Sequence, residues 1–386
     1  MKVCHIINSL EAGGAQIMLR SLLSKTRDLG ISSHVVCLLG RGPLSDEIEE
    51  LGVSVSYLGW KRGALPLLQI FELTRELRRT SPDLVQSWLY QSDFVAAISC
   101  LLSAKRFPLV WTVHTCSPDD RLAGWSTRNV RKLNGKMSRR IPSSIVYVSN
   151  AARSVHEGLG YFSDKGCVIP NGIDVGRFVP CAGYRDDIRE ELGLRSETPL
   201  VGMLARFDPS KDHRTFLSAA NRVRAANPEC HFVLAGNDVL PSNSPLMAMA
   251  REFEVDNCLH LLGRRDDTHR LHAAFDVEIL ASHAWEGFGL VVAEALACGV
   301  PCVVSDTGAL SEVLSGFGEA VPEKDPVSMA RACLAIMTLS RSERSEMCAK
   351  ASQYVASSFS LENVAEQYVQ LWGRLAARNV LPRLAS

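Results

Sequence analysis

The chain has 386 residues, of which 46% are hydrophobic and 22% charged, and its formal net charge is zero. This is the composition of an ordinary soluble globular protein, and the length predicts two domains. Because the charges balance, no overall field draws the whole protein to nucleic acid or to a membrane. Residues 1–8 lack a signal-peptide pattern, and the longest uncharged apolar run, near 94–102, is too short to cross a membrane.

The twelve cysteines are scattered without a C-x2-C pair, and most lie in apolar segments. Such cysteines are typical of reduced core thiols in a cytoplasmic protein, so we expect neither disulfide bonds nor a zinc site. His269 and His272 form the only close histidine pair, which is a weak basis for a metal site. We therefore expect no bound metal ion and no resident cofactor.

Short apolar runs alternate with helical patterns along the whole chain. In the first half we expect strands at 2–8, 33–39, 53–58, 84–88, 109–114 and 144–148. The pattern restarts after Pro180, with strands expected at 199–205, 231–236, 258–262, 276–280 and 301–304. Strands separated by helices form parallel sheets with right-handed crossovers, so the predicted fold class is α/β with two doubly wound Rossmann-like domains. The glycine- and proline-containing stretch 171–183 is the best linker, and the predicted domains are residues 1–178 and 179–359.

Polar segments stand where ligands bind in such sheets, at the carboxyl ends of the strands. His114, Arg206 and the segment 282–289 all follow predicted strands, and the glycine loop at Gly13 and Gly14 follows the first strand. We expect a cleft between the two domains to bring these segments together.

The most informative segment carries Glu286 before a glycine-bounded turn and Glu294 inside an otherwise uncharged helix. A helix that is apolar on all sides is buried, and a carboxylate there is costly unless it is paired or hydrogen-bonded. Gly287 and Gly289 let a ligand approach the backbone, and the N–H groups at a helix start favour phosphate. A sugar nucleotide would satisfy both the anion site and the two carboxylates. The structural alternative is a capping carboxylate together with one glutamate bonded to another strand.

This segment resembles the E-x7-E signature of the retaining glycosyltransferases of family 4, which use nucleotide-sugar donors. Five further segments resemble the family and occur in its order: Glu11–Gln16, Thr112–Thr115, Tyr147–Arg153, Ile169–Asp174 and Arg206–Asp212. The family commonly has glutamate at the position of Gln16, which leaves a local role on the acceptor side open. The resemblance implies the two-domain GT-B fold, with the C-terminal helix within 360–386 crossing back onto the N-terminal domain.

The resemblance also implies roles for single residues. Glu294 would hold the ribose hydroxyls, Glu286 the hydroxyls of the transferred sugar, and the backbone near Gly289 the diphosphate. The implied catalytic residues are Glu286, His114, Arg206 and Lys211. The implied donor-binding residues are Gly13, Gly14, Arg206, Lys211, Arg264, Glu286, Gly287, Phe288, Gly289, Leu290 and Glu294.

Cleavage of a sugar from a nucleotide diphosphate builds negative charge on the diphosphate. The sequence contains no D-x-D pair that could hold a metal ion there, so side chains and helix dipoles must meet the charge. Arg206 offers a bidentate fork and Lys211 a mobile point charge. In isolation, a solvated pair bound to Asp208 or Asp212 explains the same residues. No residue can be assigned as a nucleophile, so a front-face reaction with retention is our working hypothesis.

Residues 121–141 contain seven cationic residues and no acidic one. Val130, Leu133, Met137 and Ile141 share one face of a predicted basic amphipathic helix. Such a helix can lie on an anionic membrane, bind a lipid-linked diphosphate, or pack its apolar stripe inward. The partners that we expect are a UDP- or GDP-sugar donor and a glycan or lipid-linked acceptor, with no nucleic acid. The expected location is the cytoplasm, at the inner face of the membrane.

The favoured function is therefore a metal-independent, retaining glycosyltransferase of cell-surface polysaccharide synthesis. The alternative is a nucleotide-sugar-binding protein without transferase activity, although both glutamates, the Arg/Lys pair and His114 are all present. A dinucleotide oxidoreductase would need G-x-G-x-x-G after the first strand, where this chain has Ala-Gly-Gly-Ala-Gln at 12–16.

Overall fold

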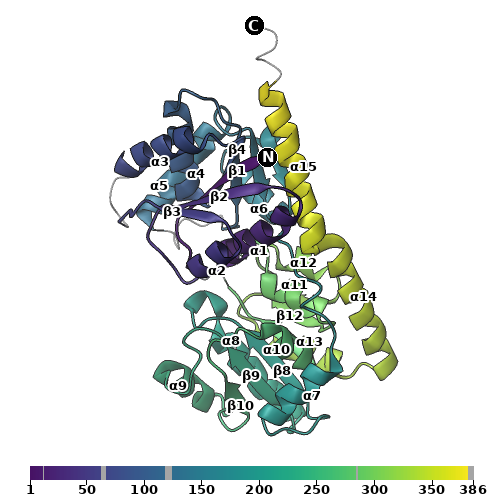
Figure 1. Ribbon diagram of the computed structural model, residues 1–386. Helices are drawn as coiled ribbons and strands as arrows, with labels where there is room; N and C mark the ends of the chain where they lie inside the picture. The colour runs from purple at the N-terminus through teal and green to yellow at the C-terminus, as the bar shows by residue number, and fades with distance from the viewer. Residues whose placement is uncertain (12, 62–66, 118–123, 284–285, 381–386) are drawn as a thin grey trace. The chain divides into compact units, whose positions relative to one another are not determined.

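The computed structural model describes residues 1–11, 13–61, 67–117, 124–283 and 286–380. The chain forms two compact units, Met1–Gly172 with Leu361–Ser386, and Ile173–Ser360. Each unit is built on its own parallel sheet with helices on both faces, which confirms the predicted pair of Rossmann-like α/β domains (Figure 1). The division falls before the predicted boundary at residue 178. Ile173 already forms a bridge with Ser360, so the chain enters the second unit at that residue.

The first sheet has the strand order β3-β2-β1-β4-β5-β6-β7. Its strands are β1 (Lys2–Ile7), β2 (Ser32–Cys37), β3 (Ser54–Tyr57), β4 (Leu84–Trp88), β5 (Leu109–Val113), β6 (Ser144–Tyr147) and β7 (Gly166–Val168). All neighbouring strands run parallel, and the order reverses between β1 and β4. Such a reversal opens a crevice at the carboxyl ends of the two strands, where α/β proteins bind ligands.

Helices cover both faces of the first sheet. They are α1 (Gly14–Asp28), α2 (Ser45–Glu50), α3 (Leu67–Thr80), α4 (Tyr90–Leu102), α5 (Trp125–Ser138), α6 (Asn150–Gly158), the short 3-10 turn η1 (Ser163–Lys165) and α15 (Leu361–Val380). Helices α1, α2 and α15 share one buried cluster with the sheet, whereas α3, α4 and α6 share the other. The apolar residues of α3 that pack inward recur at helical spacing, at Ile70, Leu73 and Leu77.

Helix α15 completes the first unit although it is the last helix of the chain. It packs against α1 and β4, and Trp372 donates a 2.6 Å hydrogen bond from Nε1 to Oε1 of Gln86 in β4. Lys25 of α1 forms an ion pair with Glu362 at 2.5 Å. Figure 1 shows α15 in yellow beside the purple α1. One face of the first sheet is thus covered by residues from both ends of the sequence.

The second sheet has the order β10-β9-β8-β11-β12-β13, again all parallel, and its reversal lies between β8 and β11. Its strands are β8 (Leu200–Leu204), β9 (His231–Ala235), β10 (Leu259–Leu261), β11 (Val277–Leu280), β12 (Cys302–Ser305) and β13 (Gly318–Val321). Its helices are α7 (Ala182–Glu191), η2 (Pro209–Lys211), α8 (His213–Ala226), α9 (Ser244–Glu252), α10 (Thr268–Ala274), α11 (Leu290–Ala297), α12 (Leu310–Leu314), α13 (Pro326–Met337) and α14 (Arg341–Phe359).

One strand in each sheet, β7 in the first and β13 in the second, is absent from the predicted elements. Both are edge strands of three or four residues that begin with glycine, and neither is fully buried. A short, half-exposed edge strand carries no long apolar run and therefore gives no strand signal in the sequence.

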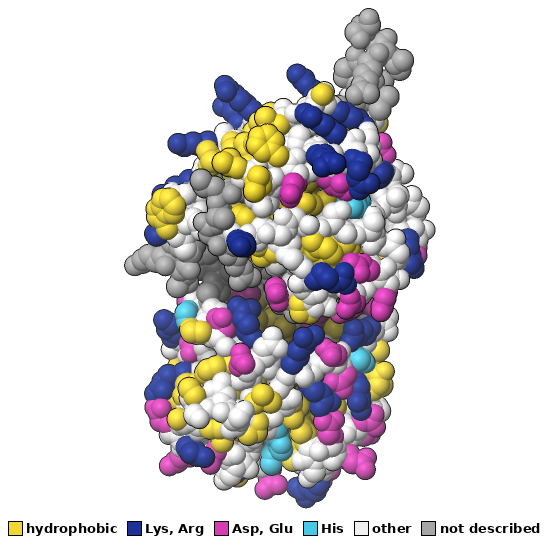
Figure 2. All heavy atoms as spheres, turned by 60° about the vertical axis from the view of Figure 1, so that its left-hand side comes forward, with side chains coloured by type: hydrophobic (Ala, Val, Ile, Leu, Met, Phe, Trp, Pro, Cys, Tyr) yellow, Lys and Arg dark blue, Asp and Glu magenta, His cyan; other side chains and the backbone are white. Residues whose placement is uncertain are grey.

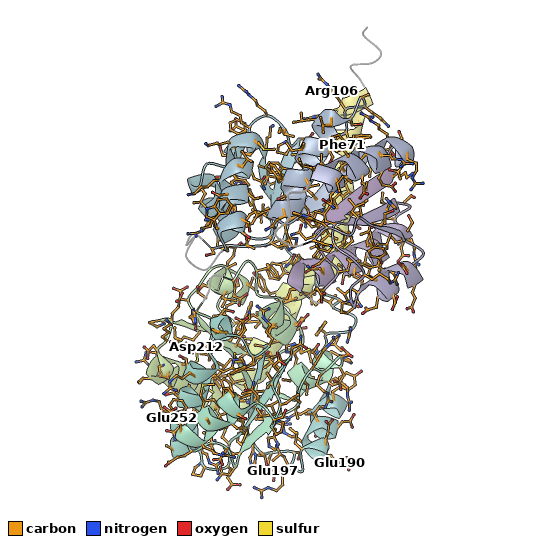
Figure 3. All side chains as sticks on the ribbon, turned by 90° about the vertical axis from the view of Figure 1, so that its left-hand side faces the viewer. Phe71, Arg106, Glu190, Glu197, Asp212 and Glu252 are labelled. Atoms are coloured by element: carbon orange, nitrogen blue, oxygen red, sulfur yellow. The ribbon has the colours of Figure 1, made fainter. Side chains whose placement is uncertain are left out.

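Charged side chains of both signs are spread over the face shown in Figure 2. Toward the top of that view, hydrophobic side chains gather among lysines and arginines. Phe71 of α3 and Arg106, which follows α4, are labelled in this region of the first unit in Figure 3. Both side chains are exposed.

Candidate active site

Lys211 and Glu286 form an ion pair between the two strand ends at the reversal point of the second sheet. Lys211 ends the short turn η2 after β8, and Glu286 follows β11. Lys211 donates from Nζ to Oε1 of Glu286, although 75 positions separate them in sequence. Both side chains are about one-fifth exposed, at 18% and 21%, so a ligand can reach them while their pairing is partly shielded from water. The structure thus brings together two residues that the sequence placed in one site.

Three further contacts hold Glu286 and its loop in this position. Ser282 donates a 2.8 Å hydrogen bond to the same carboxylate oxygen, Oε1. The backbone N–H of His283 donates to the carbonyl oxygen of Ser210 at 3.0 Å, which joins the β11 end to η2. The N–H of Ala309 donates to the Glu286 carbonyl oxygen at 2.9 Å. The carboxylate is therefore fixed through both its side chain and its backbone.

Gly308 permits the last of these contacts. Its φ is +60°, and a Cβ built on it would stand 2.2 Å from the Glu286 carbonyl oxygen and 2.5 Å from the Glu286 nitrogen. Only glycine tolerates both that backbone conformation and that approach. The loop after β12 thus supports the loop after β11 by direct backbone packing.

Helix α11 begins beside Glu286, directly after Gly289. Gly289 is the N-cap residue with φ +95° and ψ 57°, and a Cβ there would meet the Leu310 side chain at 2.6 Å. Phe288 is buried against the ring of Phe359, with ring centroids 5.2 Å apart, and this packing fixes the entry of the chain into the helix. The N–H groups of Leu290 and Val291 precede the first donation to the Gly289 carbonyl oxygen, which is made by Val292 at 3.0 Å, and they present the positive end of the helix dipole. The helix start can therefore bind an anion.

Glu294 is the fifth residue of α11 and has a protein partner that could not be predicted from the sequence. His272 of α10 lies between two carboxylates, with Nδ1 2.6 Å from Oε2 of Glu278 and Nε2 3.4 Å from Oε2 of Glu294. Burial alone would lower the pKa of His272, but Glu278 and then Glu294 outweigh it and raise this pKa to about 9. His272 is therefore a cation at neutral pH and orients Glu294.

This arrangement corrects the expectation that a ligand must compensate the carboxylate of Glu294. A ligand is not needed to compensate the Glu294 carboxylate, because His272 already does so. Glu294 is still 19% exposed, so its carboxylate remains accessible to hydroxyl groups. Glu294 thus bonds to another element, as the structural alternative requires, and its carboxylate is also accessible to a ligand.

Arg206 has a different environment from Lys211. Its side chain is 58% exposed, and Nε lies 3.2 Å from Oδ2 of Asp208. Partial burial raises the pKa of Asp208, but hydrogen bonds from Ser210 and the charge of Arg206 lower it overall. The predicted pairing with Asp208 therefore exists for Arg206, whereas Lys211 turns to Glu286. A rim arginine of this kind is free to reorient toward a phosphate.

Arg264 lies on another loop of the second unit. It is 52% exposed and contacts Asp266 at 3.3 Å. The preceding strand, β10, ends at Leu261, one residue before the predicted end at residue 262. Gly263 has φ +64°, and its backbone exchanges hydrogen bonds with the loop after β9, which positions Arg264.

His114, Gly13 and Gly14 belong to the first unit. His114 follows β5, and its ring stacks on Trp88 with centroids 5.2 Å apart and planes 25° apart. Burial lowers the pKa of His114 to about 3, so the ring is neutral, and Nε2 has no hydrogen-bond partner among the described residues. A buried ring nitrogen left open in this way is suited to a ligand hydroxyl.

The glycine loop is a helix start. Gly13 caps α1 and Gly14 is its first residue, and the Ile17 N–H donates to the Gly13 carbonyl oxygen at 2.9 Å. Gln16, which stands where the family commonly has glutamate, is buried and folds back toward Gly13: its Oε1 lies 2.7 Å from where a Gly13 Cβ would be. The roles of these glycines toward a ligand remain predictions.

Three residues without a predicted role at the site support it in the second unit: His272, Ser282 and Gly308. The sequence offers His272 only as a weak candidate metal ligand. Its spacing of six residues before Glu278 carries no recognisable signal, because the contact arises from the packing of α10 against β11 and α11. Gly308 could have been found as a glycine after a strand, where close backbone approach is common.

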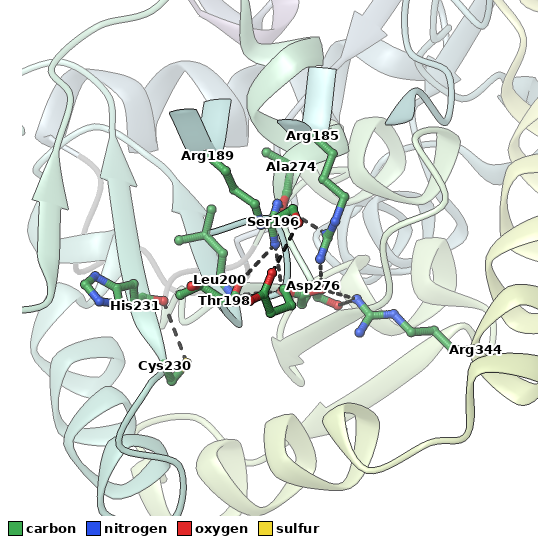
Figure 4. Close-up of polar contacts among 11 residues, drawn as sticks. Arg185, Arg189, Ser196, Thr198, Leu200, Cys230, His231, Ala274, Asp276 and Arg344 are labelled. Atoms are coloured by element: carbon green, nitrogen blue, oxygen red, sulfur yellow. Dashed lines mark hydrogen bonds and ion pairs between the residues drawn. The ribbon is translucent and has the colours of Figure 1, made fainter. Parts of the chain in front are cut away.

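A second polar cluster lies at the opposite, amino end of the same strands and is structural (Figure 4). Asp276, just before β11, accepts from the Leu200 N–H at 2.8 Å. Arg185 and Arg189 of α7 and Arg344 of α14 surround the same carboxylate at 2.8–2.9 Å. One buried aspartate thus ties two helices to the starts of β8 and β11.

The basic segment contains helix α5, and three of the four residues of its apolar stripe face inward. Val130, Met137 and Ile141 pack against the first unit's core, and Arg131 is buried and donates to the Ser117 carbonyl oxygen. Leu133 is 42% exposed. Residues 121–123 of the segment lie outside the described residues. Within the described part of the chain, every helix is too short or too polar to span a bilayer.

Comparison with known proteins assigns a family to this fold and site. The model named Glycosyltransferase Family 4 matches residues 12–177, and the model named Glycosyl transferases group 1 matches residues 184–355. HepE from Anabaena, solved in complex with UDP-glucose, superposes with a TM-score of 0.83 at 20% identity, covering 97% of this chain and 100% of that one. The fold is therefore that of the GT-B glycosyltransferases. The chain belongs to glycosyltransferase family 4.

Relatives match most of the length of this chain and of their own. The N,N'-diacetylbacillosaminyl-diphospho-undecaprenol alpha-1,3-N-acetylgalactosaminyltransferase of Campylobacter jejuni is 28% identical, over 73% of this chain and 75% of its own. The D-inositol 3-phosphate glycosyltransferase of Corynebacterium jeikeium is 24% identical, over 83% of each chain. Relatives of this protein thus act in the synthesis of lipid-linked glycans and of other glycosides.

Proposed function

We propose that this protein transfers a sugar from a nucleotide-diphosphate donor to a glycan or lipid-linked acceptor, with retention of configuration and without a metal ion. The observation that carries the proposal is the Lys211–Glu286 ion pair beside the Gly289 start of α11. It places a cation, a carboxylate and an anion-binding helix end within one loop cluster. Glu294, fixed by His272, adds a second carboxylate one helical turn away.

Each group has a chemical task in this proposal. The diphosphate binds at the start of α11, and Lys211 and Arg206 neutralise the charge that grows on it as the sugar leaves. Glu294 accepts hydrogen bonds from the ribose hydroxyls and Glu286 from the transferred sugar. His114, neutral and with Nε2 open, is the proposed contact of the first unit with that sugar.

The proposed reaction occurs on one face of the sugar. The bond between the anomeric carbon and the phosphate oxygen breaks, and the acceptor oxygen bonds to the same face. The acceptor proton passes to the departing phosphate oxygen. Isolation of a covalent glycosyl-enzyme would overturn this route, because it would reveal a nucleophile on the opposite face.

The proposal is tested with a panel of UDP-, GDP- and ADP-sugars in chelator-treated buffer, beginning with UDP-glucose. Calorimetry measures binding, and nucleotide release measures slow hydrolysis. We expect one donor class to bind wild type and to lose at least ~10²-fold in turnover with Arg206→Ala or Glu294→Ala, as for other groups that stabilise transition-state charge. Glu346→Ala, in an exposed pair on α14, serves as the control.

Two results would overturn the proposal. One is a folded protein that binds no donor even when a lipid-linked acceptor is present. The other is full binding without turnover toward every acceptor offered, which would favour a nucleotide-sugar-binding protein. Transfer that stops on chelation and returns with a divalent ion would overturn only the metal-independent part.

A further inference from the structure

Helices α3 and α4 expose an unusual group of large hydrophobic side chains, here called the apolar patch. It consists of Leu67, Leu68 and Phe71 of α3 and Leu101 and Leu102 of α4, which are 60%, 71%, 66%, 62% and 48% exposed. Four of these are among the five most exposed large hydrophobic side chains in the described part of the chain. Single exposed leucines are normal on a protein surface, but a concentration of this kind marks a binding surface.

The exposed side chains of the patch do not belong to the face of α3 that packs into the core. The inward face of α3 is already occupied, because Ile70, Leu73 and Leu77 lie in the core. Leu68, Phe71 and Arg75 follow the helical spacing of the opposite face and point to solvent. Helix α3 therefore carries a second apolar surface at its start, which is exposed in the described part of the chain.

The ends of α3 and α4 are joined, so their exposed side chains form one surface. Ser99 of α4 donates to the Ile70 carbonyl oxygen at 3.2 Å. Arg78 of α3 donates to the Leu102 carbonyl oxygen at 2.7 Å. The last turn of α4 thus runs beside the middle of α3. In Figure 2 hydrophobic and basic side chains gather together on this part of the first unit, and Figure 3 labels Phe71 and Arg106 there.

Basic side chains follow the patch along the chain, within α3 and just after α4. The residues from the middle of α3 onward and those just after α4 include five basic side chains: Arg75, Arg78, Arg79, Lys105 and Arg106. The same stretches contain two acidic residues, Glu72 and Glu76, and Glu76 is already engaged by Arg79 at 2.6 Å. In a protein without net charge, this is a local excess of positive charge beside exposed leucine and phenylalanine side chains.

We infer that the apolar patch, together with the five basic side chains beside it, docks the protein onto a membrane that contains anionic lipids. Leucine and phenylalanine side chains enter the boundary between headgroups and acyl chains, while the arginines and lysines bind lipid phosphates. The excess of arginine and lysine beside the patch favours a surface of lipid phosphates over a protein partner, since lysine is depleted at protein interfaces. The inference deepens the proposed function, since a lipid-linked acceptor would be met at that membrane. The docking itself requires no catalysis.

This surface differs from the one that the sequence suggested. Val130, Met137 and Ile141 of the basic segment pack against the core, whereas Trp125 and Leu133 of α5 are 76% and 42% exposed. These two exposed apolar side chains are eight positions apart and form a smaller apolar surface than the five of the apolar patch. The larger group of exposed apolar side chains therefore belongs to α3 and α4.

The test is flotation of the full chain with phosphatidylcholine vesicles, with and without 30 mol% phosphatidylglycerol (on the order of the anionic content at which surface charge attracts basic patches). We expect wild type to float with the anionic vesicles and to dissociate as salt rises. Leu68→Ser/Phe71→Ser should lower the partition coefficient at least ~10-fold by removing the inserted groups. Arg75→Glu/Arg106→Glu should abolish the preference for anionic lipid. The control, Val327→Ser, changes a 55% exposed side chain of the second unit and should bind like wild type.

Several results would overturn the inference. These are wild type that floats with neither vesicle, or patch variants that float as well as wild type. A third is a wild-type dimer, in light scattering without vesicles, that the patch variants convert to monomer, since a second copy would then be the occupant. Hydrolysis of the donor without vesicles separates this inference from the proposed function: patch variants should keep wild-type turnover. Flotation without any turnover would leave the docking surface standing and remove the proposed function.

Discussion

Gly308 lies against the backbone of Glu286, so closely that a methyl group at position 308 would overlap the Glu286 carbonyl oxygen. We expect Gly308→Ala to push the Glu286 loop away from Lys211 and to lower kcat/KM at least ~10-fold, because displacements of about 1 Å in a site have effects of this size. Steady-state kinetics with the donor identified above would measure it.

The matched control is Gly193→Ala. Gly193 has φ +68°, close to that of Gly308, but a Cβ there meets nothing within 4 Å. It should cost about 1 kcal/mol of stability through backbone strain alone and leave turnover intact. Equal kinetics for the two variants would show that the approach of Gly308 to Glu286 has no role in activity.

Lys211→Ala should lower kcat by ~10²–10³ if Lys211 meets charge that develops on the leaving diphosphate. The variant also leaves Glu286 without its cation, although Ser282 still donates to that carboxylate. Lys350→Ala, which breaks an exposed pair with Glu346, should leave kcat unchanged. A rise in KM at constant kcat would instead mean that Lys211 binds substrate and transition state equally.

The His272 pair with Glu278 and Glu294 predicts a pH-dependent stability. The pKa of His272 is raised to about 9 in the folded protein from 6.5 when unfolded, so its contribution is complete below pH 6.5 and is lost as pH rises through 9. We expect Tm to fall between pH 6.5 and 9 more steeply in wild type than in His272→Gln. Thermal melts across that range measure the difference, and parallel slopes would contradict a protonated His272.

Asp276→Ala should be strongly destabilising, by ~3–5 kcal/mol, because Arg185, Arg189 and Arg344 would lose their shared counter-ion. Arg189 is almost fully buried and cannot turn to water. Glu252→Ala breaks an exposed pair with Arg214 and should cost at most ~1 kcal/mol. Urea unfolding compares the two, and similar midpoints would mean that the arginines find other partners.

Sequence reasoning was most successful where the physics is local. The apolar runs of β4, β5 and β8 are buried strands, and two parallel sheets followed from their alternation with helices. Lys211 and Glu286 could be placed in one site because the carboxyl ends of neighbouring parallel strands share one edge. The family resemblance then supplied the roles expected of these residues.

What could not be predicted arises from packing between elements. The contact of His272 with Glu294 depends on how α10 lies against α11, and the support of Glu286 by Gly308 depends on two loops meeting. The outward direction of Phe71 and the inward direction of Val130 both follow from which helix face meets the sheet. The stripe in α5 looked amphipathic in either orientation, since helical period alone does not say which side faces water.

The return of α15 to the first unit has a consequence for biosynthesis. Trp88, Tyr368 and Trp372 share one buried aromatic cluster, and the two last-named residues belong to α15. While the ribosome is still producing the second unit, the first sheet has neither that helix nor the indole that bonds to Gln86. The N-terminal domain therefore emerges first and is finished last. A nascent chain has to keep this bare apolar face from aggregating until residues 361–380 have left the exit tunnel.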